Sequence, residues 1–303
     1  MNNSARVKFR LLLSVALAGT LAIASVSPAN AQMLLLGVGS NRPVSGGSYS
    51  GPGDVVASAL GWWGLRAYDG TKAAALTAAL QLCTSGDAVC TDIHVTSTGG
   101  LNTSEISSAG CSTGGACTAK TVYDQSGNGH NCTNATEGAR PFFNKDYFGA
   151  GKPGIYAVNG SNRQLNCASL PTQAVPFTYV TYTAKEQTPG GNDRTWVAAD
   201  PVGVLYTPSN NFAVYAGSLA SSSFTATLNT GYAVIGMADA TGAACKVSVS
   251  GNVTTGLSCG TNSTGTPGEV VSSNRSGIRE WGYYGIGFSV GEITAMDSNM
   301  QGF

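Results

Sequence analysis

The densest group of side chains that could carry chemistry is the segment Tyr123 to His130, which reads YDQSGNGH. It follows a short β-type run, so we expect a strand that ends in a tight turn. In such a turn, Asp124 and Ser126 can accept hydrogen bonds from main-chain amides, and the glycines permit positive φ. This pattern favours a rigid structural turn. The alternative places Asp124 and Asn128 on the rim of a ligand site.

The sequence contains few residues that could bind a metal or form a catalytic triad. The sequence has no C-x-x-C and no H-E-x-x-H, and its only two histidines are His94 and His130. His94 lies in the strand-like run DIHV, and His130 ends the turn described above. A zinc site or a Ser-His-Asp triad therefore has few ways to form. No phosphate-binding motif is present either, and we predict no metal and no cofactor.

The elements that must position these residues are mostly short strands. Runs of β-branched and aromatic residues recur about every ten residues between Gly, Ser, Asn and Pro turns. They are 177–183, 196–199, 204–207, 212–215, 224–228, 232–237, 246–250 and 281–288. This spacing predicts an all-β fold, an antiparallel sandwich or jelly roll.

Two helices are expected beside the strands. Alanines favour a helix over Lys72 to Leu82. Ser289 and Glu292 form a capping box before a short C-terminal helix over Ile293 to Met300.

Composition excludes several classes of protein. The chain has 303 residues with 16 Lys+Arg, 16 Asp+Glu and 41 Gly. So little charge argues against a nucleic-acid binder, which needs a basic surface, and against a disordered chain. The balance also predicts no polyanionic or acidic membrane partner.

The first 31 residues have the pattern of a signal peptide. Arg6, Lys8 and Arg10 precede an apolar stretch from Leu11 to Val26, and Ala29-Asn30-Ala31 is an A-x-A cleavage site. We expect cleavage after Ala31 and a secreted or periplasmic protein. Residues 32–50 are expected to be a flexible lead-in, and residues 51–303 one domain. No later segment is long and apolar enough to span a bilayer.

Eight cysteines follow the predicted cleavage site, an even number that suits disulfides in an oxidising compartment. Eight cysteines allow 105 connectivities, so the sequence gives only a preference for local pairs. The preferred pairs are Cys83 with Cys90, Cys111 with Cys117, Cys132 with Cys167, and Cys245 with Cys259.

Four segments of the N-terminal half carry a family signature in matching order and spacing. They are Gly51–Ser58 (GPGDVVAS), Ala67–Gly70 (AYDG), Cys111–Cys117 (CSTGGAC) and Tyr123–Gly127 (YDQSG). Together they resemble the catalytic domain of α-L-arabinofuranosidase B, glycoside hydrolase family 54. The resemblance implies a concanavalin A-like or laminin G-like jelly roll, the fold class that the strand pattern also indicates.

The family is a retaining glycosidase, which needs two carboxylates about 5 Å apart. Its nucleophile segment best matches Trp196–Tyr206, where Trp196, Asp200 and Leu205 agree and Val202 stands at the nucleophile position. Its acid/base segment matches 272–277, with Ser273 at the acid position. The family's adjacent Cys-Cys pair and its arabinose-binding β-trefoil have no counterpart in this sequence.

The resemblance implies that Asp200 helps to hold the sugar, and we add Trp196 and Asp124 as predicted substrate-binding residues. Asp200, Glu269 and Glu280 are the carboxylates that could replace the missing catalytic pair. We expect Glu269 in a loop and Glu280 at an exposed strand start.

Tryptophan and tyrosine rings could also stack on sugars, although a core role is favoured. Neighbouring side chains on a strand face opposite sides, so one of Tyr283 and Tyr284 is expected to point outward.

Three functions stay open on the sequence. The first is an arabinofuranosidase that hydrolyses arabinofuranosyl side chains of a polysaccharide. The second is a non-catalytic carbohydrate-binding or cell-surface recognition module of the laminin G or lectin type. The third is a structural envelope or adhesion domain without a sugar ligand. A carbohydrate is the expected partner, and a monomer the expected state.

Overall fold

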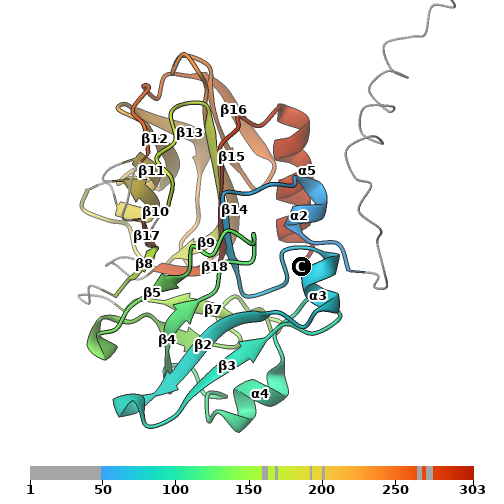
Figure 1. Cartoon of the computed structure of the whole chain (residues 1–303). Helices are drawn as coiled ribbons and strands as arrows, with labels where there is room; N and C mark the ends of the chain where they lie inside the picture. The colour runs from blue at the N-terminus through green and yellow to red at the C-terminus, as the bar shows by residue number, and fades with distance from the viewer. Residues whose placement is uncertain are drawn as a thin grey trace, which may run out of the picture. The chain divides into compact units, whose positions relative to one another are not determined.

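Antiparallel strands dominate the computed structural model (Figure 1). It describes residues 49–158, 163–167, 170–191, 193–199, 202–264, 268–270 and 276–303, with the backbone alone for 193–199 and 268–270. The predicted signal peptide and most of the predicted lead-in lie outside these residues. No helix among them is long and apolar enough to cross a bilayer.

One run of antiparallel strands has the order β16–β15–β14–β9–β18–β1. Their bounds are β1 Gly61–Gly64, β9 Phe177–Lys185, β14 Tyr232–Ala238, β15 Cys245–Val249, β16 Asn252–Leu257 and β18 Ser276–Tyr284. Between β15 and β16, Ser250 and Gly251 both have positive φ. That conformation suits a two-residue hairpin turn.

A second antiparallel run has the order β13–β12–β11–β10–β17–β8–β5. Its strands are β5 Cys132–Thr133, β8 Leu165–Cys167, β10 Asp193–Ala199, β11 Val202–Tyr206, β12 Asn211–Tyr215, β13 Leu219–Thr225 and β17 Gly268–Val270. Side chains of the two runs meet in one core, where Val204 and Val214 lie against Gly236 of β14. The all-β sandwich predicted from strand spacing is therefore confirmed.

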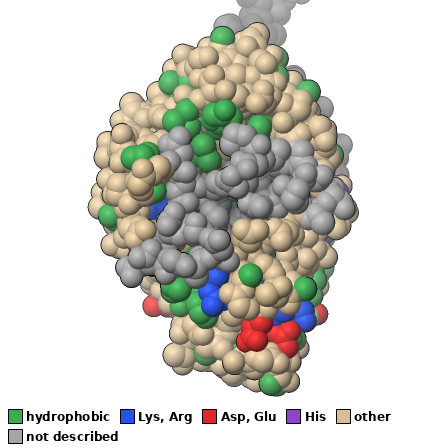
Figure 2. All heavy atoms as spheres, turned by 90° about the vertical axis from the view of Figure 1, so that its left-hand side faces the viewer, with side chains coloured by type: hydrophobic (Ala, Val, Ile, Leu, Met, Phe, Trp, Pro, Cys, Tyr) green, Lys and Arg blue, Asp and Glu red, His purple; other side chains and the backbone are tan. Residues whose placement is uncertain are grey.

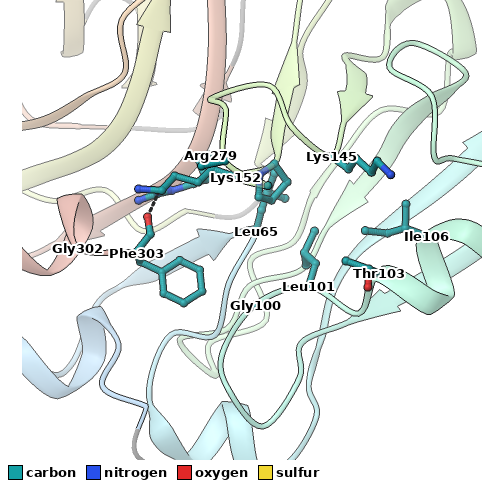
Figure 3. Close-up of a pocket in the computed structure, with 13 residues that line it drawn as sticks. Leu65, Gly100, Leu101, Thr103, Ile106, Lys145, Lys152, Arg279, Gly302 and Phe303 are labelled. Atoms are coloured by element: carbon teal, nitrogen blue, oxygen red, sulfur yellow. Dashed lines mark hydrogen bonds between the residues drawn. The ribbon is translucent and has the colours of Figure 1, made fainter.

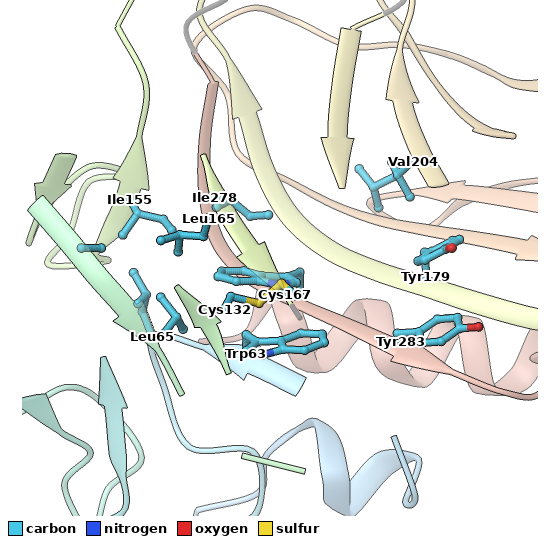
Figure 4. Close-up of a cluster of buried hydrophobic side chains, with 14 of the residues drawn as sticks. Trp63, Leu65, Cys132, Ile155, Leu165, Cys167, Tyr179, Val204, Ile278 and Tyr283 are labelled. Carbon is cyan, nitrogen blue, oxygen red and sulfur yellow. A yellow bond between two sulfur atoms is a disulfide. The ribbon is translucent and has the colours of Figure 1, made fainter. Parts of the chain in front are cut away.

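The remaining strands extend from the edge of β18 through β7, β6 and β4 to β2 and β3. They are β2 Ala78–Thr84, β3 Cys90–His94, β4 Cys117–Val122, β6 Phe142–Asn144 and β7 Gly154–Tyr156. Figure 4 shows the part of the core in which Trp63, Leu65, Ile155, Leu165 and Ile278 gather beside the Cys132–Cys167 disulfide.

The central strands of the first run are buried on both faces. In β14, Val234 belongs to the core between the two runs, whereas Ala233 and Ile235 pack in a second cluster with Ile293 and Met296 of helix α5. Helix α5 covers one face of these central strands and the second run of strands covers the other, so neither face is exposed to solvent. This explains why β9, β14 and β18 are buried at every position.

The C-terminal helix predicted from the capping box is α5, Val290–Gln301, and both reciprocal bonds of Ser289 and Glu292 are present. Three shorter α-helices are described: α2 Pro52–Val55, α3 Gly70–Ala74 and α4 Thr103–Ser108. Two 3-10 turns are also present, η1 Ser85–Asp87 and η2 Glu137–Ala139.

The helix predicted over Lys72 to Leu82 is wrong in its second half. Helix α3 stops at Ala74, and the chain becomes strand β2 from Ala78. Strand β2 pairs with both β3 and β4, and Ala79, Leu80 and Leu82 are completely buried. Tertiary pairing and burial outweigh the helical propensity of alanine here.

The four disulfides join the pairs that the cysteine order favours: Cys83–Cys90, Cys111–Cys117, Cys132–Cys167 and Cys245–Cys259. No free cysteine occurs among the described residues. Four disulfides are consistent with an extracellular or periplasmic location.

Candidate functional site

The turn that carries the YDQSG signature is held by its own polar side chains. Asp124 accepts main-chain hydrogen bonds from Trp62 and Ser126 at Oδ1 and from His130 at Oδ2, at 2.9–3.0 Å. Asn128 donates to the carbonyl oxygens of Ala59 and Leu60. These bonds tie the turn to the segment before β1, so they give Asp124 a structural task. Its predicted contact with substrate stays a prediction.

Gln125 is the residue of this turn whose importance the sequence did not reveal. Its buried side chain donates to the carbonyl oxygens of Gly64 and Arg66 and accepts from the amide of Tyr68. A buried amide with all these partners cross-links two distant segments. The one indication of this role in the sequence was the position of Gln125 within the YDQSG signature, between Asp124 and Ser126, which both hold the turn.

Glu280 is buried in the middle of β18, so the expected exposed strand start is wrong. Its Oε2 accepts from Nε of Arg66 at 2.6 Å, and its Oε1 accepts from a terminal nitrogen of Arg279 at 2.7 Å. All three side chains are at most 1% exposed. A substrate cannot reach this carboxylate in the described conformation.

The charge state of Glu280 follows from these contacts. Burial alone would raise the pKa of Glu280, but the charges of Arg66 and Arg279 lower it below its ordinary value. Glu280 therefore stays ionised at neutral pH and cannot serve as a general acid. Its role in this geometry is to neutralise two buried arginines.

The aromatic side chains proposed as sugar platforms are core residues where the structure describes them. Trp62, Trp63, Trp281, Tyr283 and Tyr284 are all completely buried. The expectation that one of the two tyrosines points outward is wrong, because both faces of β18 are covered. Tyr283 packs in the core between the two runs of strands, and Tyr284 packs in the cluster under α5.

The strands that carry the other candidates are neighbours. Strand β10 pairs with β11 on one side and with β17 on the other, and Val197 is the register partner of Glu269. Trp196 and Glu269 thus lie on adjacent strands, so the expectation that Glu269 lies in a loop is wrong. The structure describes only the backbone of these two residues. Asp200 and Ser273 lie outside the described residues altogether. Val202, at the family's nucleophile position, is buried and belongs to the core.

The sequence also contains three matches to G-x-S-x-G, the pattern of a hydrolase nucleophile elbow, at Gly110–Gly114, Gly256–Gly260 and Gly287–Gly291. The first lies between α4 and β4, and the second lies at the end of β16. The first two do not occupy the strand-to-helix turn that the elbow needs. The third lies between β18 and α5, but its Ser289 caps the helix and its hydroxyl accepts from the amide of Glu292. None of the three serines is hydrogen-bonded to a histidine within the described ranges, so no nucleophile is indicated.

One group of described residues has the spacing of a metal site, namely Cys83, Asp87 and Cys90. Both sulfurs are joined in a disulfide, so the thiolates that a metal needs are gone. Asp87 is paired with Arg140 and Lys120. The group is therefore structural.

Charged side chains are sparse on the face drawn in Figure 2, where they gather toward the lower end. A cavity of about 380 Å³ lies between α4, the 145–153 loop and the C-terminal residues, and Arg279 lines it (Figure 3). None of the predicted site residues lines this cavity, although Glu280 directly follows Arg279 in sequence.

No protein-family profile matches the sequence, and no curated protein matches it. Solved structures are similar in fold. An α-L-arabinofuranosidase of family GH54, soaked with a cyclic sulfate inhibitor, has a TM-score of 0.59 at 14% identity, covering 82% of this chain and 64% of that chain. An arabinofuranosidase complexed with arabinofuranosyl-α-1,2-xylobiose has a TM-score of 0.58 at 16% identity, with the same coverage. The chain spans less than two thirds of those proteins and has an arabinofuranosidase-like fold.

Proposed function

We propose that this chain is an exported carbohydrate-active protein that hydrolyses arabinofuranosyl side chains of a polysaccharide. The observation that carries the proposal is the arabinofuranosidase-like fold over 82% of the chain. The four matching segments of the N-terminal half support it. The signal-peptide pattern of residues 1–31 and the four disulfides support export.

The proposed site lies at strands β10, β11 and β17. Asp200 follows β10 in sequence and is the proposed sugar-holding carboxylate, with Trp196 as a proposed stacking ring. Glu269 on β17 is the proposed second carboxylate, because the register places its backbone beside the strand that leads to Asp200. Glu280 is a poor candidate, since two arginines already occupy its oxygens.

An assay with an aryl α-L-arabinofuranoside tests the hydrolase. The purified protein should release the aryl group. Glu269→Gln should lower kcat/KM at least about 100-fold, the usual loss of a catalytic carboxylate, and Asp200→Asn should lower kcat/KM by weakening the hold on the sugar. Glu137→Gln, a neutral variant outside the proposed site, should keep full activity. Absence of turnover above buffer with several furanosides would exclude hydrolysis.

A second function, glycan binding without hydrolysis, is favoured by one specific observation. Val202 stands where the family has its nucleophile, and its buried apolar side chain cannot attack a sugar. Titration with arabinofuranosyl oligosaccharides distinguishes the two functions. Saturable binding without product, weakened in Asp200→Asn, would select the binding module. Binding and turnover lost together in that variant would select the enzyme.

A further inference from the structure

The cavity lined by Arg279, here called the Arg279 pocket, has one apolar wall and one cationic wall. Its volume is about 380 Å³, within the range of small-molecule sites. Leu65, Leu101, Ile106 and Phe303 supply the apolar wall. Arg279, Lys152 and Lys145 supply the cations, and no acidic side chain lines the pocket among the described residues.

Arg279 brings a buried charge with one hydrogen-bond donor left over. Its terminal nitrogens donate to the main-chain oxygens of Phe303 and Met300 and to Glu280. Its Nε–H is buried and has no partner within the described part of the chain. Since the whole side chain is buried, Arg279 contributes its positive charge to the pocket rather than a hydrogen bond to a ligand.

Lys152 adds a second cation beside Arg279. Burial lowers the pKa of Lys152, and the charges of Arg279 and Arg66 lower it further. The ammonium makes only one long contact, 3.5 Å from the main-chain oxygen of Gln301. Lys145 is exposed at the other end of the pocket, near Thr103 and Ile106 (Figure 3).

The charges of the pocket do not balance. Glu280 is shared by Arg66 and Arg279, which leaves one positive charge in that trio before the two lysines are added. If the main-chain oxygen of Phe303 belonged to a terminal carboxylate, its negative charge would cancel the one remaining charge of the trio. Both lysines would still lack a counter-charge. The pocket therefore attracts an anion.

We propose that the Arg279 pocket binds a small organic carboxylate of about monosaccharide size. A carboxylate can accept charge-assisted hydrogen bonds from the Lys152 ammonium, and the nearby buried charge of Arg279 adds to the attraction. The apolar wall requires a body with carbon atoms, which inorganic phosphate lacks. A hexuronate and a simple aromatic acid share this chemistry. The assignment does not depend on hydrolysis or on the site at β10 and β17.

Calorimetric titration of the purified full chain at low salt tests the proposal. Galacturonate, glucuronate and phenylacetate are the carboxylate probes, with galactose and inorganic phosphate as comparisons. Binding of at least one carboxylate, weakened by added salt, supports the proposal. If only the two hexuronates bind, the ligand is an acidic sugar. If phenylacetate binds as well, the pocket is a general carboxylate site. Equal binding of galactose, binding of phosphate alone, or no carboxylate binding at millimolar concentration would overturn the proposal.

A matched pair of variants locates the binding. Lys152→Gln should weaken carboxylate binding roughly tenfold, the loss expected for one charge-assisted hydrogen bond. Lys72→Gln removes the same charge from α3, which contributes no residue to the lining of the pocket, and should leave the affinity unchanged. Lys152 is only partly buried, so its variant is expected to fold, and a thermal melt checks this. Equal affinity of both variants and the unmodified protein would place the ligand elsewhere and overturn the proposal.

Discussion

At the scale of single residues, the trio Arg66, Glu280 and Arg279 holds three ionised groups with almost no contact with water. Charges are taken out of water at a high cost, and their mutual attraction repays it only when the geometry is complete. Arg66 also donates to Asn299 of α5, and Arg279 donates to Met300. The trio therefore connects β18 with the last turn of the C-terminal helix.

We predict that Glu280→Gln lowers the free energy of unfolding by about 3–5 kcal/mol, because two buried arginines lose their counter-charge. Urea titration at pH 7 measures this loss. Asp92→Asn neutralises an exposed carboxylate on β3 but keeps an oxygen that can accept from Tyr123 and Gln81, so it should change stability by no more than about 1 kcal/mol. Equal small effects of both variants would contradict the structural role given to Glu280.

The pH dependence of stability gives a second test of Glu280. Its pKa is lowered in the folded protein from an ordinary value of 4.5, so the unfolded chain binds the proton more readily. Its stabilising contribution is complete above that ordinary pKa and disappears as the pH falls through the lower folded pKa. The stability difference between the unmodified protein and Glu280→Gln should therefore shrink in acid. A difference that stays constant down to pH 3 would refute this linkage.

At the scale of elements, helix α5 is fixed to the β15–β16 hairpin by Asp297. Its Oδ2 accepts from the hydroxyl of Ser248 at 2.7 Å and from the amide of Gly251, and its Oδ1 accepts from Gln301. Burial raises the pKa of Asp297, and the hydrogen bonds oppose that shift only in part. The carboxylate thus works mainly as a hydrogen-bond acceptor, at some cost in desolvation.

We predict that Asp297→Ala lowers the free energy of unfolding by about 1–3 kcal/mol, since it leaves the buried hydroxyl of Ser248 and the amide of Gly251 without their acceptor. Asp297→Asn keeps an accepting oxygen and should cost less than about 1 kcal/mol. Because the pKa of Asp297 is raised in the folded protein, protonation of this carboxyl group stabilises the fold. This proton-linked part of the stability is complete below the ordinary pKa and is lost as the pH rises through the folded pKa, whereas the hydrogen bonds remain. Chemical denaturation at pH 7 compares the variants. Equal losses in both would show that the charge, rather than the acceptor, is needed.

The elements show where prediction from sequence works and where it stops. Strands in the C-terminal half and helix α5 were predictable, because alternating β-branched runs and a capping box are local signals. Strand β2 was not, because its alanines favour a helix and only the partners β3 and β4 decide otherwise. Helix α4 had a local signal that was missed. Asn102 caps it and Glu105 stands at the third position, the spacing of a capping box.

At the scale of the whole molecule, the four disulfides differ in the length of chain that they close. Cys132–Cys167 spans 35 residues, and Cys111–Cys117 spans 6. Chain-entropy reasoning gives about 4 kcal/mol for the longer loop and about 2 kcal/mol for the shorter. We predict that double serine replacement of each pair follows this order in thermal melts. A larger loss for the short loop would show that strain or packing, rather than loop entropy, governs these bonds.

The candidate site was less predictable than the fold. The YDQSG signature predicted a turn held by polar side chains, which the structure has, whereas the contact of Asp124 with a substrate stays a prediction. Glu280 looked accessible because strand periodicity cannot show that both faces of β18 are covered. The Arg279 pocket left no local pattern, since Leu65, Lys152 and Arg279 come from three distant segments.

The pairing of β1 with β18 also sets an order of events in folding. Gly61 is the register partner of Tyr283, so β1 has no neighbour in the sheet until residues 276–284 are available. A chain that emerges from a ribosome or a translocation pore can therefore add β1 to the sheet only after residues 276–284 have also emerged. Contacts of such long sequence separation make folding slow. Before that point, the 124–125 turn is the available hydrogen-bond partner of Trp62.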